Sequence, residues 1–377
     1  MKKILKKFIA LVMTILFIFS FSTSFVSALD KNSITQSDIE QALESDVKNM
    51  WNAVLDSPEA LGFTYDEVKN AFIGEPFNIV QYSDDSINIV KDILYLPVIS
   101  SDNIIALITL IKYDGFISCS IGKDFAPELS DYLNKNKSEV ALFSMNTNIY
   151  GITPSSKITE LFIAPTDSTI YSENNNLNIS YLDVACYNNI ITKDDILNKS
   201  FTIHKDATKA ATAYKYLIEF PIVFQGSLPI CWAATIASMV IFELPNKYPQ
   251  LYATQVCDKI GHPYKGSTVA ENIKALKAYL PNNIYVPTFY NRTMTPSEVQ
   301  VIINNIDPAL MGSSCSVGPH ATALCGYAWY GNTFQIRLMD PAYECFKFST
   351  YSGGKYKYAF GNHVMEWKDT IRLLYKA

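Results

Sequence analysis

The sequence of 377 residues lacks several features that mark other classes of protein. Its cysteines include no C-x-x-C pair, which argues against a structural zinc site. It has 31 Lys and Arg against 36 Asp and Glu, without a basic block, so nucleic acid and anionic lipid are poor candidates for partners. Beyond the N-terminus, no apolar stretch is long enough to span a membrane. We therefore expect no metal, no nucleic-acid partner and no stable membrane insertion.

The first 28 residues have the composition of a secretory signal peptide. Four lysines precede an apolar run over residues 8–21, and Val26-Ser27-Ala28 fits a small-residue cleavage site. A membrane anchor is the alternative, but the run is shorter than the ~20 residues that a spanning helix needs. We expect removal of residues 1–28 by a signal peptidase and a secreted protein, either free outside the cell or associated with its surface.

Cysteine occurs in an odd number, seven, in a chain that we expect to be secreted. At least one thiol is therefore free or pairs with another molecule. Cys231 is the candidate for the free thiol. The other six are expected to be small buried apolar residues rather than disulfide partners: Cys119, Cys186, Cys257, Cys315, Cys325 and Cys345.

Residues 29–204 are expected to form an N-terminal domain of α+β type. The pairs Ser37 with Glu40 and Thr64 with Glu67 are capping-box signals for two helices. Nothing in this region suggests chemistry of its own. Strands are predicted over residues 77–82, 93–99, 104–111 and 116–121, with a hairpin turn at Asp114-Gly115 and a helix over 127–135.

Residues 205–213 are small and polar and predict an exposed linker that proteases can cut. A second α+β domain, residues 214–377, follows. Its helices come first: an apolar one over residues 231–244, then two that begin with capping boxes at Thr268 and Thr295. Antiparallel strands come afterwards. Helices followed by strands predict a cleft where the two halves of the domain meet.

The segment Q-G-S-L-P-I-C-W-A-A places Gln225 six positions before Cys231, which opens the apolar helix. Unpaired N–H groups and the positive end of the helix dipole favour a thiolate at such a position. The amide of Gln225 can point at the oxygen that becomes negative when a thiolate attacks a carbonyl. Cys231 is therefore a candidate nucleophile and Gln225 a candidate oxyanion donor. A buried core cysteine is the alternative.

His320 and Asp340 follow in the order that a cysteine nucleophile needs. His320 starts an apolar run in G-P-H-A-T-A-L-C-G-Y, and Asp340 ends another in F-Q-I-R-L-M-D-P. A base and its orienting acid on neighbouring strands, facing a cysteine at a helix end, form a catalytic triad built on a thiol. Asn362 and Asp307 are alternatives for the orienting group. His262 and His363 are expected to be surface or structural residues, and Trp232 is expected to pack beside the helix rather than to contact substrate.

Gln225, Cys231-Trp232, His320 and Asp340, in this order, resemble the site of the papain-like cysteine peptidases. The compact arrangement is most similar to the secreted bacterial staphopain-type enzymes and related short papain folds. It departs from papain in three ways: Leu228-Pro229-Ile230 stands where papain has Cys-Gly-Ser, the histidine follows the cysteine after only 89 residues, and aspartate replaces the usual asparagine. These departures leave the reaction class unchanged and concern substrate preference.

The resemblance implies a papain-like fold for residues 214–377, with a helical half and an antiparallel half. It implies hydrolysis of protein or peptide substrates through Cys231, His320 and Asp340, with Gln225 in the oxyanion hole and no metal or organic cofactor. In the staphopain-type enzymes a half-barrel prodomain precedes the peptidase and is removed to activate it. The N-terminal domain is similar in size and pattern, so we expect intramolecular inhibition. A permanent substrate-binding or cell-surface module is the alternative.

Two other classes of function remain open. Some papain-like proteins carry out acyl transfer or cleave cell-wall amides, although the D-C-S motif of one cell-wall group is missing because Ile230 precedes Cys231. A catalytically inactive secreted binding or adhesion protein is the non-enzymatic alternative. The complete set of four candidate residues favours an enzyme, and we expect a secreted endopeptidase that is made as a zymogen.

Overall fold

The N-terminal region begins with short helices, and the first of them starts at an unexpected cap. Thr35 and Asp38 form the capping box of α2 (Gln36–Ala42), where the sequence indicated Ser37 and Glu40. The Asp38 carboxylate accepts the Thr35 N–H at 2.7 Å, so the helix starts two residues earlier than expected. The computed structural model of this protein describes residues 32–83, 86–136, 139–164, 179–185, 190–198, 211–316 and 318–376.

Some of the regions predicted from the sequence lie outside the described residues. They are the signal peptide over 1–28, Cys186, and residues 205–210 of the linker. Within the described part of the chain, no helix combines the length and the apolar character that crossing a membrane requires.

The capping box at Thr64 and Glu67 is confirmed at the start of α4 (Tyr65–Val68). The remaining helical elements of this region are η1 (Leu43–Val47), α3 (Lys48–Asp56), η2 (Pro58–Leu61), α4 (Tyr65–Val68), α5 (Ala126–Lys135), α6 (Tyr181–Ala185) and α7 (Lys193–Leu197).

Three long antiparallel strands form the centre of the N-terminal region, as predicted: β4 (Ile93–Ser100), β5 (Asn103–Tyr113) and β6 (Phe116–Gly122). The hairpin between β5 and β6 turns at Asp114-Gly115, where both residues have positive φ, 48° and 82°. A second sheet has the order β3-β2-β7-β8-β9, with β10 beside β7, and its β2–β7 pair is parallel. The shorter strands are β1 (Phe72–Ile73), β2 (Val80–Ser83), β3 (Ser86–Ile89), β7 (Val140–Met145), β8 (Asn148–Ile152), β9 (Ile158–Phe162) and β10 (Ile190–Ile191).

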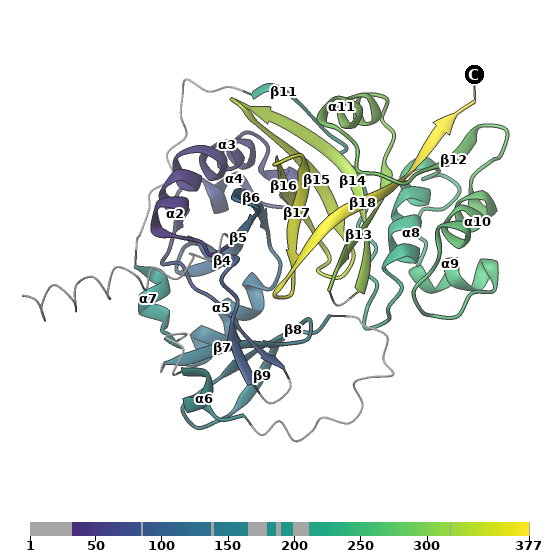
Figure 1. The fold of residues 1–377 in the computed structure, drawn as a ribbon. Helices are drawn as coiled ribbons and strands as arrows, with labels where there is room; N and C mark the ends of the chain where they lie inside the picture. Colours follow the sequence, from purple (N-terminus) through teal and green to yellow (C-terminus); the bar gives the residue numbers. More distant parts are fainter. Residues whose placement is uncertain are drawn as a thin grey trace, which may run out of the picture.

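Three helices of the C-terminal region, α8 (Cys231–Glu243), α9 (Ala253–Ile260) and α10 (Val269–Tyr279), lie on the far side of the molecule from the N-terminal region (Figure 1). α8 starts at Cys231, as the sequence predicted, and is apolar on every side, so it is almost completely buried. The capping boxes at Thr268 and Thr295 are also confirmed. The helices are α8 (Cys231–Glu243), α9 (Ala253–Ile260), α10 (Val269–Tyr279) and α11 (Pro296–Asn304).

The C-terminal strands form antiparallel neighbours in the order β16-β15-β14-β13-β18-β12, and β14 is the long central strand that contacts α8. The coarse α+β class predicted from the sequence is therefore observed: helices combined with sheets that are antiparallel in nearly all described pairs. The strands are β11 (Ala211–Tyr216), β12 (Tyr285–Tyr290), β13 (Ala309–Cys315), β14 (Gly318–Tyr330), β15 (Thr333–Asp340), β16 (Cys345–Ser352), β17 (Lys355–Phe360) and β18 (His363–Tyr375).

The two regions share one continuous sheet. β6 of the N-terminal region pairs with β16 of the C-terminal region through Gly122 with Lys347 and Ile121 with Phe348. The order β1-β4-β5-β6 therefore continues directly into β16-β15-β14 (Figure 1). Residues 211–213, which the sequence placed in the linker, begin β11 and pair with β14.

Buried polar contacts reinforce this junction. The guanidinium of Arg337 on β15 donates to the carbonyl of Ala60 in the N-terminal region and to that of Leu217 at 2.7 Å. Tyr330 donates its hydroxyl to Asp56 at 2.7 Å. Each bond satisfies a polar group that would cost free energy if it were buried without a partner. The two regions are therefore joined by specific bonds as well as by apolar contact.

Candidate active site

Cys231 is the first residue of α8, and its sulfur faces β14. The backbone N–H of Ala321 donates to the sulfur at 3.4 Å. One turn further along the same helix, Thr235 donates its hydroxyl to the carbonyl of Ala321 at 3.2 Å. These two contacts bind the helix end and the strand together on both sides of one residue, so the position of the sulfur relative to β14 is fixed.

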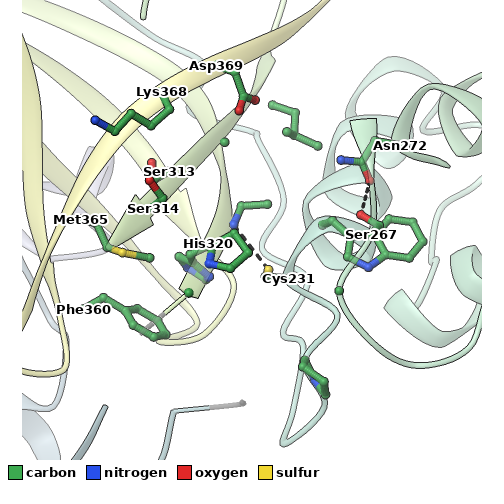
Figure 2. A pocket seen from close by; sticks show the side chains of 18 of the residues that line it. Cys231, Ser267, Asn272, Ser313, Ser314, His320, Phe360, Met365, Lys368 and Asp369 are labelled. Atoms are coloured by element: carbon green, nitrogen blue, oxygen red, sulfur yellow. Dashed lines mark hydrogen bonds between the residues drawn. The ribbon is translucent and has the colours of Figure 1, made fainter. Parts of the chain in front are cut away.

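His320 precedes Ala321 on β14, and Asp340 is the last residue of the neighbouring strand β15. Nε2 of His320 lies 2.8 Å from Oδ1 of Asp340, and the two residues are 4% and 0% exposed. With Nε2 bound to the carboxylate, Nδ1 is the ring nitrogen left for Cys231. The ring of Phe360 covers the imidazole at a centroid distance of 4.5 Å. Figure 2 shows His320 and Cys231 next to each other in one pocket.

The three side chains shift one another's pKa. Burial alone would raise the pKa of Cys231, but the hydrogen bond and charge of His320 outweigh burial and lower it. Burial would lower the pKa of His320, but the Asp340 carboxylate and Cys231 raise it to about 9. Burial acts against the charge of Asp340, yet Lys347 and His320 hold its pKa at about 2. Thiolate, imidazolium and carboxylate can therefore be present together near neutral pH.

Gln225 lies in the loop before α8 and is tied to the strand that carries Asp340. Its backbone N–H donates to the carbonyl of Pro341 at 3.1 Å, and its side-chain Nε2 donates to the carbonyl of Leu228 at 2.8 Å. The side chain is 4% exposed and does not line the pocket that holds Cys231. One of its two amide hydrogens is thus used within the loop, and its side-chain oxygen is buried without a hydrogen-bond partner among the described residues.

The pocket around Cys231 has a volume of about 400 Å³ and lies between the helices and the sheet. Trp232 of α8 and Leu310 of β13 line it. Figure 2 shows Asn272 on the helical side of the pocket and Asp369 on the sheet side. Thr147, from the turn between β7 and β8 of the N-terminal region, also lines it. The pocket is therefore formed by both regions of the chain.

Trp232 and His262 have structural contacts. The indole N–H of Trp232 donates to the carbonyl of Lys265 at 2.9 Å, and its ring meets that of His262 edge to face. His262 lies 3.2 Å from the carboxylate of Glu271. Trp232 also forms part of the pocket wall, so it can contact a ligand as well as support the helix.

The alternative orienting groups for His320 are occupied elsewhere. Asn362 donates to the carbonyl of Ile79 at 2.8 Å and to the hydroxyl of Ser144 at 3.1 Å. Asp307 lies 3.8 Å from Arg372, and burial raises its pKa to about 8. The carboxylate beside His320 is therefore that of Asp340. His363 likewise bonds to the N-terminal region, through the carbonyl of Asn146.

Sequence reasoning missed two charged residues next to this site, Lys347 and Asp124. Lys347 lies on β16, two residues beyond Cys345, which is paired with Asp340. A lysine inside the apolar run C-F-K-F was a signal, because buried strands rarely hold an unpaired cation. Asp124 follows β6, and no feature of the sequence connects it to the site. Its contact arises from the pairing of β6 with β16.

The buried cysteines differ from Cys231. Cys257 and Cys325 have no imidazole beside them, and burial raises the pKa of each to about 11. Burial also raises the pKa of Cys119 and Cys345. These four are buried thiols, as the sequence predicted, but the prediction is wrong for Cys315, which is only half-buried at the end of β13. In the described ranges, no group of three or more His, Cys, Asp and Glu side chains is placed to hold a metal ion.

The site therefore combines a partly exposed cysteine at a helix start, a histidine and a carboxylate, in a pocket that both regions of the chain line. A scan of the sequence against models of protein families finds no match, and a search among curated proteins finds none either.

Proposed function

We propose that this protein is a secreted papain-like cysteine endopeptidase that is made as a zymogen. The observation that carries the proposal is the contact of Cys231 with His320, whose far nitrogen lies 2.8 Å from Asp340. Cysteine catalysis needs a thiolate, a base and a group that orients the base, and these three side chains can provide them. The pocket between α8 and β14 supports the proposal, because a papain-like peptidase would bind its substrate between the helices and the sheet.

In the proposed mechanism, the Cys231 thiolate attacks the carbonyl carbon of a peptide bond. The electron pair of the C=O bond moves to oxygen, and the resulting oxyanion is stabilised by the backbone N–H of Cys231 and the amide of Gln225. The His320 imidazolium then gives its proton to the amide nitrogen as the C–N bond breaks. An amine leaves, and the acyl group remains on the sulfur as a thioester.

Water completes the cycle. His320, now neutral, takes a proton from water while the water oxygen attacks the thioester carbon. The C–S bond breaks, an acid is released, and the thiolate and imidazolium are restored. Asp340 keeps Nε2 protonated, so that Nδ1 faces the sulfur throughout. In this scheme Asp340 stabilises the imidazolium and does not itself take up a proton.

Labelling with a peptide epoxide that reacts with thiols tests the proposal. We expect mass spectrometry of the secreted protein to show the label on Cys231, and little on Cys257, whose pKa is raised to about 11. Synthetic peptides should be cleaved at an internal bond. An unlabelled Cys231 in the folded protein, or labelling equal to that of Cys257, would contradict the assignment.

Substitution of Gln225 tests the oxyanion hole. We expect Gln225→Ala to reduce kcat for peptide hydrolysis by ~100-fold or more, as the loss of one oxyanion donor does. The matched control is Gln255→Ala on α9, whose side chain accepts the backbone N–H of Tyr252 at 2.9 Å and contributes only to a helix cap. Equal rates for the two variants, with a lower melting temperature for Gln225→Ala, would make Gln225 a purely structural residue.

Inhibition by the N-terminal region is supported by the place of Thr147. Thr147 lines the pocket of Cys231. Its backbone carbonyl oxygen lies against Gly361, and a Cβ atom added at residue 361 would be only 2.1 Å from that oxygen. Phe162 of β9 also packs edge to face against Phe360, which covers His320. We propose that the turn between β7 and β8 restricts the entry of a substrate for as long as the N-terminal region stays bound.

Processing in residues 205–213 is not expected to release the N-terminal region by itself. The paired strands β6 and β16 and the bond from Arg337 to the carbonyl of Ala60 remain after the chain is cut. We expect limited trypsin digestion, with cuts at Lys205 or Lys209, to yield two fragments that elute together in gel filtration. They should separate only in denaturant, and separation in plain buffer would contradict the prediction.

A further inference from the structure

Lys347 is a buried cation next to the proposed catalytic residues. It lies on β16 and is 1% exposed. Its Nζ lies 2.5 Å from Oδ1 of Asp124, 3.3 Å from Oδ2 of Asp340, and 3.7 Å from the ring centre of Tyr343. A lysine is stable in such a place only when acidic partners compensate for its loss of water. Lys347 therefore depends on both carboxylates.

Asp340 is shared between two cations. Its Oδ1 contacts His320 at 2.8 Å and accepts the backbone N–H of Ala342 at 3.1 Å. Its Oδ2 faces Lys347. The positive charge of Lys347 opposes the effect of Asp340 on the imidazolium, since the same carboxylate serves both. The strength of the Asp340–His320 interaction consequently depends on what else neutralises Lys347.

Asp124 provides that neutralisation, and it comes from the N-terminal region. It lies in the loop between β6 and α5, just after Gly122, which is paired with Lys347. A Cβ at residue 122 would be 2.8 Å from Cγ of Lys347, so glycine leaves room for the lysine side chain. The end of β6 thus supplies both the space for Lys347 and its closest counterion.

We propose that Lys347 is a positioning residue of the active site, and that Asp124 of the N-terminal region balances its charge so that Asp340 can hold the imidazolium of His320. This inference rests on the proposed function, because it assigns Lys347 and Asp124 to the same nucleophilic site. The N-terminal region then contributes to the charge balance of the catalytic pair in addition to lining the pocket.

The other titratable groups around this network are tyrosines and one thiol. Tyr343 and Tyr358 face Lys347 with their rings, Tyr95 lies near Asp124, and Cys345 is on the same strand. Burial raises the pKa of all four, so they stay neutral through the pH range in which His320 loses its proton. Burial also raises the pKa of Asp124, against the opposing effect of Lys347. His320 itself faces Cys231, Asp340 and the uncharged ring of Phe360.

The pH dependence of alkylation tests the proposal on the full chain. Iodoacetamide is added from about pH 4 to about pH 11, and mass spectrometry gives the rate at Cys231 alone. The rate should rise in two steps, first as the thiolate forms beside the imidazolium and then near pH 9 as His320 loses its proton. The second step reports on His320.

Two variants should move the second step in opposite directions. In Asp124→Asn, Asp340 is the only carboxylate left to neutralise Lys347, so Asp340 stabilises the His320 imidazolium less. The pH of the second step should therefore fall by about half to one unit. Lys347→Met combined with Asp124→Asn removes both charges and leaves Asp340 to His320, so the step should rise. The double variant leaves no charge buried alone, so it remains a test if Asp124→Asn fails to fold.

Asp38→Asn is the matched control. It breaks the ion pair of Asp38 with Lys112 in the N-terminal region, 2.7 Å long and largely buried, and should leave both steps in place. If the second step stays at the same pH in the double variant, or moves in the same direction in both variants, the role of Lys347 is wrong but the proposed function is not affected. If the protein without substitutions does not show two steps, the proposed function is wrong, and the role of Lys347 with it.

Discussion

Replacing Cys231 with alanine is expected to abolish peptide hydrolysis, with a fall in kcat of at least ~10⁴-fold. The thiolate forms the covalent intermediate, and the pKa of Cys231 is lowered, whereas burial raises the pKa of Cys325 to about 11 and that of Cys345 to about 12. The measurement is the initial rate on a synthetic peptide. Labelling at residue 231 is lost by the same change.

The control for this prediction is Cys257→Ala. Cys257 is completely buried on α9, so its loss leaves a small cavity and lowers the free energy of unfolding without affecting the rate. Cys231→Ala should show the reverse, a melting temperature close to that of the unchanged protein and no turnover. A Cys231→Ala protein that still hydrolyses peptides would exclude this nucleophile.

Replacing Asp340 with alanine is expected to affect stability and catalysis together. The change leaves the imidazole of His320 without its partner and Lys347 with Asp124 alone, and all of these side chains are almost completely buried. Removing one member of a buried ion pair costs ~3–5 kcal/mol of unfolding free energy. We expect a loss of that size in urea unfolding, together with a fall in kcat of ~100-fold or more because the imidazole is no longer oriented.

The pH dependence separates the charge of Asp340 from its shape. Asparagine can keep the hydrogen bond to His320, but it lacks the charge. The pKa of Asp340 is about 2 in the folded protein, below its ordinary value. The contribution of its charge to the free energy of unfolding is therefore present above ~pH 4 and is lost as pH falls through about 2. The pKa of His320 is about 9, above its ordinary value, so its contribution is complete below ~pH 6.5 and is lost as pH rises through about 9.

Asp340→Asn should therefore be most destabilised relative to the unchanged protein between ~pH 4 and ~pH 6.5. The difference should become smaller above about pH 9, where His320 is neutral in both proteins. Urea unfolding at about pH 5.5 and about pH 10 measures it. A difference that does not change with pH would mean that the carboxylate acts through its shape rather than its charge.

Local sequence signals determined much of the fold. The start of α8 at Cys231, the capping boxes at Thr268 and Thr295, and the hairpin at Asp114-Gly115 each depend on a few neighbouring residues, and each is observed. The cap at Thr35 was missed because aspartate at the third helical position replaces the usual glutamate. Such signals find the type of an element more reliably than its first residue.

The candidate site was predictable in its residue types and their order, but not in its surroundings. Cys231, His320 and Asp340 meet because one helix start and two adjacent strand ends converge, which apolar runs and turn residues indicate. Lys347 could have been predicted from the strand register, since it lies diagonally from Asp340 on the next strand. Asp124 could not have been predicted, because no local feature of the sequence encodes the pairing of β6 with β16.

The join between β6 and β16 also has a consequence for how the chain folds. Its partners, such as Ile121 and Phe348, are separated by most of the sequence, so a very long loop must close before they meet. Contacts of this kind slow the search for the native topology, whereas the hairpins β4–β5 and β14–β15 can form early. We expect each half to acquire secondary structure first, and the docking of the two edges to be a late, slow step.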